Sequence, residues 1–170
     1  MNSERLSSRL KQPGHDRTFE DSETNFVAIA RQVLDHSKYV VEEKPSDLLA
    51  LFRATAPGER DLGIQLEAKI TNKRTRRFFY VEVKKQGDAG NADERAAKHH
   101  TVQFYATLRQ KFGLTYHPIV TVFCEALATN PRYTRKAPYY FEKNQYFNWA
   151  NYEPSLLRQY LLERCAEWLD

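Results

Sequence analysis

Three residues supply the chemistry that phosphodiester hydrolysis needs: Asp61, Glu82 and Lys84. A hard cation such as Mg²⁺ prefers oxygen ligands and usually takes one or two carboxylates with water and phosphate. A neighbouring lysine can hold the attacking water and neutralise developing charge. Glu82 and Lys84 are two positions apart and share one face of a strand, with the carbonyl of Val83 between them as a further ligand. The sequence therefore predicts a Mg²⁺-dependent nuclease site.

The surroundings of this triplet argue for a site, because an acid-x-lysine triplet by itself also occurs as a surface ion pair. A basic stretch runs through it, with Glu82 as the one acid between positions 69 and 85. The basic residues are Lys69, Lys73, Arg74, Arg76, Arg77, Lys84 and Lys85. Such a stretch favours a polyanionic partner, as does the net charge of +4.

A hairpin is needed to bring a second carboxylate to the triplet. Alternating residues predict strands over 63–70 and 77–86, joined by a polar turn. If the turn is centred between positions 73 and 74, Gln65 lies opposite Glu82. Asp61 then shares the face of Glu82, one diagonal step from Lys84. Glu67 is the rival second acid on that face, but the same register puts it farther from Lys84.

The rest of the chain predicts elements that pack around this hairpin. Apolar spacing predicts helices over 21–34, 48–53, 91–112 and 153–169, an extended piece over 38–41, a strand buried on both faces over 117–124, a polar loop over 128–138 and an edge strand within 139–149. Asn91 and Glu94 form a capping-box pattern, and Gly113 suits a C-cap. His99 and His100 are predicted as core or phosphate contacts rather than catalytic groups.

Composition predicts one globular domain over residues 21–170, after a polar arm over 1–20. No apolar run reaches the roughly 18 residues of a membrane span. Cys124 and Cys165 are far apart and lack metal-site spacing, which predicts two free thiols in a reducing cytoplasm.

Beyond the triplet, Gly90-Asn91-Ala92-Asp93-Glu94-Arg95 is a GNAxER segment that opens a predicted helix. Together with Asp61 and Glu82-Val83-Lys84 it resembles the EcoRI-type restriction endonucleases of the PD-(D/E)xK superfamily, especially their MunI-like branch. The similarity covers most of residues 38–150, including Asn130-Pro131 and Gln145-Tyr146-Phe147-Asn148-Trp149. It implies an α/β fold with a mixed central sheet flanked by helices.

The resemblance also implies a type II restriction endonuclease: a Mg²⁺-dependent homodimer that cuts palindromic double-stranded DNA and leaves 5′ AATT overhangs. Its cognate DNA methyltransferase would be a separate protein. Asp61 and Glu82 match the metal-binding acids and Lys84 the catalytic lysine. The segment that reads an inner AATT in the major groove is matched by Gly90, Asn91, Ala92, Glu94 and Arg95. Asparagine can bond adenine, and alanine can touch a thymine methyl.

Basic and polar residues near these segments are predicted to contact phosphates. They are Lys85, Gln86 and Lys98, and further along the chain Arg132, Arg135 and Lys136.

Two departures from the family pattern bear on the site. Arg60 stands where a proline usually precedes the first acid, and Ala89 stands where relatives carry an arginine that helps read the outer base pair. We therefore expect a four-base-pair AATT site without a fixed outer pair. Two alternatives are a repair or junction-resolving nuclease of the superfamily and a non-enzymatic DNA-binding module.

Overall fold

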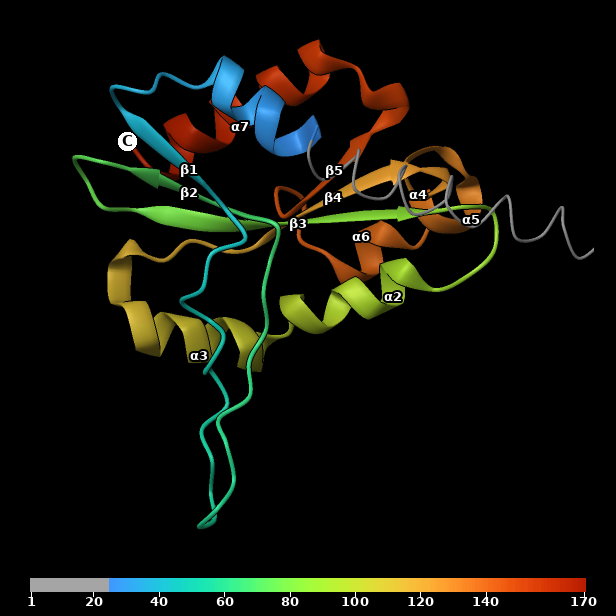
Figure 1. The fold of residues 1–170 in the computed structure, drawn as a ribbon. Coiled ribbons are helices and arrows are strands. Elements are labelled where there is room, and N and C mark those ends of the chain that lie inside the picture. The colour runs from blue at the N-terminus through green and yellow to red at the C-terminus, as the bar shows by residue number, and fades with distance from the viewer. Residues whose placement is uncertain (1–24) are drawn as a thin grey trace, which may run out of the picture.

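A mixed five-stranded sheet forms the centre of the protein (Figure 1). The computed structural model describes residues 25–170. The strand order is β1-β2-β3-β4-β5; β2 is antiparallel to β1 and β3, and β4 is parallel to β3 and β5. The strands are β1 Tyr39–Glu43, β2 Ala68–Asn72, β3 Phe78–Gln86, β4 Val120–Glu125 and β5 Tyr146–Trp149. The predicted mixed sheet flanked by helices is confirmed.

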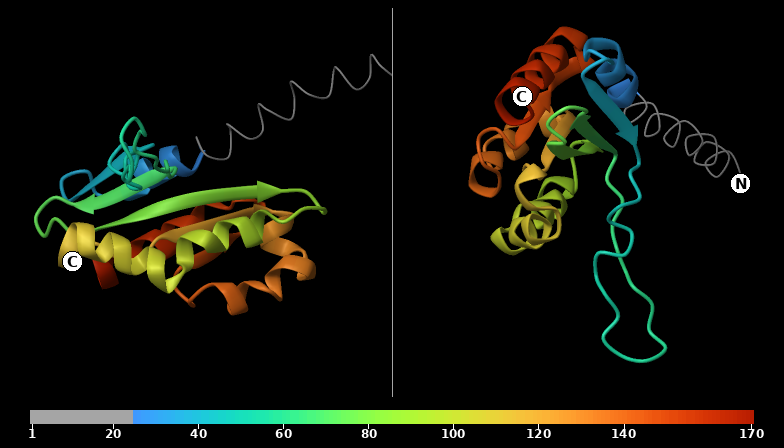
Figure 2. Two further views of the ribbon diagram at one scale, coloured as in Figure 1. Left: turned by 90° about the horizontal axis from the view of Figure 1, so that it is seen from below. Right: turned by 90° about the vertical axis from the view of Figure 1, so that its left-hand side faces the viewer.

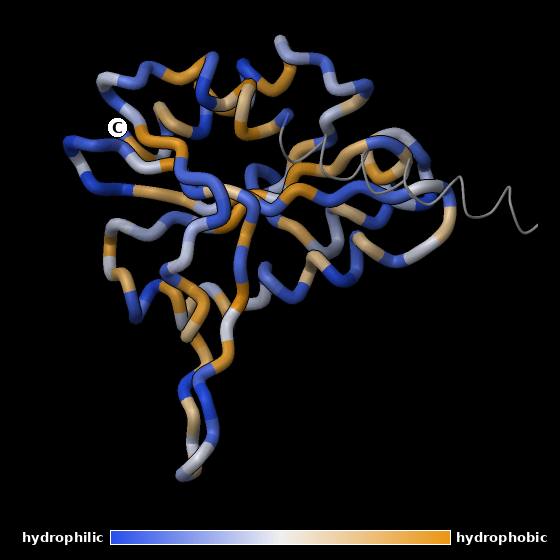
Figure 3. Tube along the Cα trace, viewed as in Figure 1, coloured by the Kyte–Doolittle hydropathy of each residue, from blue (hydrophilic) through white to orange (hydrophobic). Residues whose placement is uncertain are grey.

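Helices cover both faces of the sheet (Figures 1 and 2). A helix over residues 25–33 and α7, Pro154–Trp168, lie on one face, where they pack on Phe79, Val81 and Val83 of β3. On the other face α3, Val102–Phe112, packs on Phe78 and Tyr80. Hydrophobic residues concentrate on the central strands, whereas the β2–β3 turn is hydrophilic (Figure 3). None of the helices in the described part of the chain has the length and apolar character of a membrane span.

Several predicted elements are confirmed. They are the extended piece at β1, the buried parallel strand at β4, the edge strand at β5, the last helix at α7 and the first helix from residue 25 onward. The start of the predicted helix over 21–34 and the polar N-terminal segment over residues 1–20 lie outside the described residues. Cys124 and Cys165 are buried free thiols, and burial raises the pKa of each to about 12.

The prediction of one continuous helix over 91–112 is wrong, because the helix is interrupted at Thr101. The chain forms α2, Ala92–Ala97, then a 3-10 turn η1, Lys98–His100, and then α3. Thr101 has extended backbone angles, and its side chain accepts a hydrogen bond from the Phe104 amide at 3.1 Å. Threonine is a good N-cap, so Thr101 starts a new helix instead of continuing the preceding one. Gly113 caps α3 at φ 68°, as predicted.

The predicted polar loop over 128–138 is also wrong, since short helices occupy it. Asn130 caps one of them by accepting from the Arg132 amide at 2.9 Å, and Pro131 follows at its first position. The short elements of the chain's second half are η2 Gly113–Thr115, α4 Ala126–Thr129, α5 Pro131–Thr134, α6 Ala137–Tyr140 and η3 Ala150–Tyr152.

A long loop, here called the arm (residues 49–64), projects from the β1–β2 connection (Figures 1 and 2). The predicted helix over 48–53 and the early part of the predicted strand over 63–70 are therefore wrong. Phe52 and Leu62 exchange both backbone hydrogen bonds, at 2.7 and 2.8 Å, and Gly58 turns the tip at φ 85°. Gly63 passes so close to Leu48 that a Cβ would lie 2.2 Å from its carbonyl oxygen. The arm is thus a paired structure with a tight base.

The β2–β3 register differs from the prediction by two positions. Ala68 pairs with Val81 and Ile70 with Phe79. The turn is set by Asn72, whose side chain accepts from the amides of Arg74 and Thr75 at 2.9 and 3.1 Å. A shift of two keeps the paired residues of β2 and β3 on their predicted faces but changes which residues are opposite one another.

The chain's last residues fasten this hairpin to the edge strand β1. Asp170 accepts hydrogen bonds from Lys38 at 2.6 Å, Tyr39 at 2.5 Å and Asn72 at 3.1 Å. Burial by itself would raise the pKa of Asp170, but these hydrogen bonds outweigh burial and lower it. Ionised Asp170 therefore stabilises the fold.

We expect Asp170→Asn to lower the free energy of unfolding by about 1–2 kcal/mol near neutral pH, the usual contribution of charge-assisted hydrogen bonds. Because the folded pKa lies below the unfolded value, this contribution exists above about pH 4 and disappears as the pH falls further. Urea unfolding of both proteins across this range measures it. The matched control is Glu142→Gln, an exposed carboxylate; equal losses in both variants would contradict the prediction.

Candidate active site

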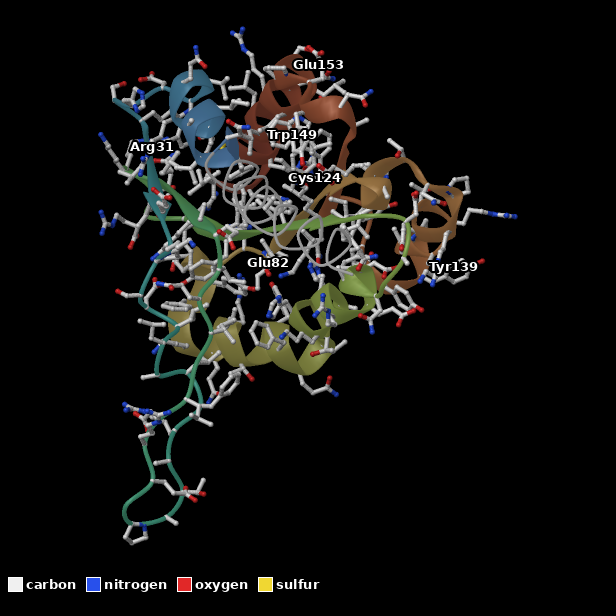
Figure 4. The ribbon with its side chains drawn as sticks, turned by 45° about the vertical axis from the view of Figure 1, so that its right-hand side comes forward. Arg31, Glu82, Cys124, Tyr139, Trp149 and Glu153 are labelled. Atoms are coloured by element: carbon white, nitrogen blue, oxygen red, sulfur yellow. The ribbon has the colours of Figure 1, made fainter. Side chains whose placement is uncertain are left out.

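Glu82 and Lys84 lie together where β3 emerges from the core. Glu82 is on the sheet face that carries α3 (Figure 4), and Lys84, two residues further along β3, shares that face. The Glu82 side chain is 6% exposed and the Lys84 side chain 32%, and the Lys84 ammonium pairs with Glu82 Oε1. The predicted shared face is confirmed. The arrangement places a carboxylate and an ammonium side by side at a partly open strand end.

Two histidines lie inside the protein behind this pair. His100 Nε2 is 2.7 Å from Thr121 Oγ1, and His99 is 7% exposed. Burial lowers the pKa of His99 to about 4, with smaller contributions from the charges of Lys98 and Lys84. Burial likewise lowers the pKa of His100 to about 4. Both rings are therefore neutral at physiological pH, as expected of core histidines.

Asp61 is not brought to Glu82 by the β2–β3 ladder. It lies on the arm, where its carboxylate accepts from the Ala54 amide at 2.8 Å and from Arg53 at 2.7 Å. The Ala54 hydrogen bond, followed by Arg53, lowers the pKa of Asp61. The register that placed Asp61 beside Lys84 is wrong, so its assignment as a metal ligand stays a prediction without that support. What the structure shows is a carboxylate that ties the arm together.

Glu67 is the acid that lies next to the observed ladder. The ladder ends at the pair Ala68–Val81, and Glu67 lies one residue from this pair, beside the strand that carries Glu82. Its backbone is held on both sides, since its amide donates to Val81 at 3.0 Å and its carbonyl accepts from Lys44 at 2.9 Å. Glu67 is half-buried. The observed pairing thus keeps the rival acid, Glu67, near the triplet, whereas Asp61 lies on the arm.

The donor set at this strand end suits a hard cation. Glu82, Glu67 and the Val83 carbonyl all offer oxygen, which Mg²⁺ prefers, and one or two carboxylates with water suffice for it. No group of three or more His, Cys, Asp or Glu side chains gathers at a common point within residues 25–170. Closed cages suited to zinc are therefore absent from this part of the chain, and an open, oxygen-rich magnesium site fits.

The predicted capping box at Asn91 is wrong, and the actual cap has consequences. Asn91 sits at the N-cap of α2 without a side-chain hydrogen bond and is exposed. The Ala92 amide instead donates to Gln86 Oε1 at 2.8 Å. Gln86, predicted as a phosphate contact, thus caps the helix from the end of β3. The Asn91 carboxamide is left to face solvent at the helix start.

The other predicted DNA contacts differ in exposure and in the side of the sheet on which they lie. Gly90, Arg95 and Lys98 are exposed on the loop and on the helices that follow it, and Ala92 is buried. Lys85 points away from this side, because residues alternate along β3, and its ammonium pairs with Glu125 at 3.1 Å. Glu94 is exposed but accepts a hydrogen bond from Lys136 at 3.1 Å.

Three residues in α2 or next to it make contacts that the sequence did not predict. Asp93 and Tyr133 had no predicted role, and Lys136 was predicted to contact phosphate. Asp93 is 3% exposed and its Oδ2 lies 2.9 Å from Lys136 Nζ. Contact with Asp93, and then with Glu94, raises the pKa of Lys136. Tyr133 is 1% exposed and accepts from Gln86 Nε2 at 2.8 Å. The only signal in the sequence for these contacts was the basic character of residues 132–136, and we interpreted it as phosphate binding.

Comparisons with known proteins give one matching family and one solved structure with a similar fold. The family described as "Type II restriction enzyme MunI" matches residues 1–169. The crystal structure of MunI restriction endonuclease in complex with cognate DNA is similar in fold, with a TM-score of 0.67 and 24% sequence identity over 78% of this chain and 83% of that chain. A comparison with curated protein sequences gives no significant match.

We expect Asp61→Asn to loosen the arm, because the variant loses the charged acceptor for Arg53 and Ala54. Trypsin should then cleave after Arg53 and Arg60 several-fold faster, since proteolysis follows local opening. Mass spectrometry of limited digests locates and times the cuts. Glu142→Gln serves as the control, and an unchanged cleavage rate in Asp61→Asn would show that the carboxylate does not hold the arm.

Proposed function

Because this chain belongs to the family of the type II restriction enzyme MunI, it is a type II restriction endonuclease, and we propose that it cuts double-stranded DNA at AATT with Mg²⁺. One observation carries the proposal: Glu82 and Lys84 lie on the strand whose end, Gln86, caps the helix that presents Asn91. Cutting and reading residues thus belong to one strand–loop–helix unit.

Each residue of this unit has a defined task in the proposed reaction. The Glu82 carboxylate, with the Val83 carbonyl, holds the cation, which when bound polarises the phosphate and lowers the pKa of the attacking water. Lys84 places its ammonium beside the reacting phosphate, where it orients water and balances the growing negative charge. The half-exposed position of Lys84 leaves it within reach of a ligand at the strand end.

We assign the second metal acid to Glu67 rather than Asp61. Glu67 lies beside the end of the β2–β3 ladder, next to the strand that carries Glu82, whereas Asp61 lies on the arm. Sequence reading falls to Gly90, Asn91, Glu94 and Arg95, which are exposed, whereas Ala92 is buried at the start of the helix. Exposed Asn91 can bond an adenine edge with both its oxygen and its nitrogen in the major groove. A palindromic site calls for a homodimer with two-fold symmetry, and a separate methyltransferase would protect the host's own DNA.

Substitutions at the strand end should abolish cleavage selectively. We expect Glu82→Gln, Lys84→Met and Glu67→Gln each to lower the cleavage rate of an AATT-containing plasmid by about a hundredfold to a thousandfold or more, because each removes charge stabilisation from the transition state. DNA binding measured without Mg²⁺ should persist. Asp61→Asn is the matched control for Glu67→Gln and should retain cleavage. The reverse pattern, loss in Asp61→Asn and activity in Glu67→Gln, would return the metal site to Asp61.

The length of the recognised site is a separate prediction. With Ala89 in place of an arginine, we expect cleavage at AATT with any flanking base pair. Digestion of a random-sequence library in Mg²⁺, followed by sequencing of the ends, reports both the flanks and the overhang. A fixed flanking base would exclude the four-base-pair site, and blunt or 3′ ends would exclude the 5′ AATT overhang.

A further inference from the structure

The reading helix α2 is too short to position itself. It has six residues, Ala92–Ala97, whereas helices in water gain stability only over about three turns or more. Its start is set by the hydrogen bond from Ala92 to Gln86, not by its own N-cap side chain. The orientation of Asn91 therefore depends on groups outside the helix.

The loop before α2 closes tightly around the Gln86 side chain. Gly90 has φ 130°, and a Cβ there would lie 2.5 Å from Gln86 Oε1. The Gln86 amide nitrogen donates to the Tyr133 hydroxyl, which lies on α5. One side chain of the catalytic strand thus joins the helix start on one side and α5 on the other.

A second connection runs from the same region to the first turn of α2. Lys136 Nζ lies 2.9 Å from Asp93 Oδ2 and 3.1 Å from Glu94 Oε1. The same ammonium is 5.5 Å from the centre of the Tyr133 ring. Asp93 is almost fully buried, so Lys136 supplies the cation that compensates its charge. Glu94 and Asp93 are consecutive, so both carboxylates of this turn converge on one lysine.

We propose that Lys136, together with Tyr133, is a positioning residue that holds α2 in its reading orientation and thereby sets base discrimination. This inference rests on the proposed function of α2. We call the set Gln86, Tyr133, Lys136 and Asp93 the brace. Discrimination depends on placing Asn91 accurately at the correct base, so a loosened helix loses more at the cognate site than at a wrong one.

The test compares kcat/KM at AATT with kcat/KM at sites carrying one substituted base pair. Lys136→Met should lower this ratio at least tenfold. Lys143→Met removes an exposed lysine charge elsewhere and should leave the ratio unchanged. Lys136→Arg keeps the charge at Asp93 and Glu94 and should restore most of the ratio. Asn91→Ala, which removes a proposed base contact, is the positive control.

A smaller change tests the brace if Lys136→Met folds poorly. Tyr133→Phe removes only the hydroxyl that accepts from Gln86, and it should lower the ratio in the same direction. Its matched control is Tyr139→Phe, because Tyr139 is 87% exposed (Figure 4).

The outcomes separate the brace from simpler roles. A uniform loss at all sites in Lys136→Met, with a shallower dependence on salt, would overturn the inference and make Lys136 a phosphate contact. An unchanged ratio in both Lys136→Met and Tyr133→Phe would overturn it as well. Absence of sequence-specific cleavage by the unaltered protein would overturn the proposed function and the inference with it. Specific cleavage with an unchanged ratio overturns the inference alone.

Discussion

The hydrogen bond from the Ala92 amide to the Gln86 carboxamide is the interaction on which the arrangement of the site depends. It fixes where α2 begins relative to the strand that carries Glu82 and Lys84. It also satisfies the first amide of the helix, while the Asn91 side chain makes no capping hydrogen bond and remains exposed. Gln86 of β3 thereby determines the position of the loop residue Asn91 at the start of α2.

The parts of the fold that were predictable from sequence are those governed by burial. β4 is apolar on both faces because it lies between two strands and two helical layers, and that produces a continuous apolar run. β3 alternates between two apolar clusters before it emerges at Lys84. In both strands the residue types alone carry the constraint, since an apolar side chain has few other favourable positions.

The parts that were not predictable depend on local polar contacts or on distant packing. The β2–β3 turn contains no glycine or proline, and the Asn72 side chain moves its centre by one position, which changes the pairing by two. Leu66 appeared to continue the apolar face of β2, yet it packs with Leu48 and Tyr80 on the other side of the sheet. Asp61 was expected beside Lys84 because of the predicted register, and a polar turn determines the actual one.

The tie between Asp170 and the edge of the sheet bears on how the chain folds. The side chains that donate hydrogen bonds to the last two residues lie 94 to 132 positions earlier in the sequence. Contacts of such long separation require closure of a large loop before they contribute, and folding rates fall as these contacts increase. We therefore expect the hydrogen bonds between Asp170 and the β1–β2 edge to form late in folding. Until then β1 and β2 lack these contacts, and exposed sheet edges are sites at which partly folded chains associate.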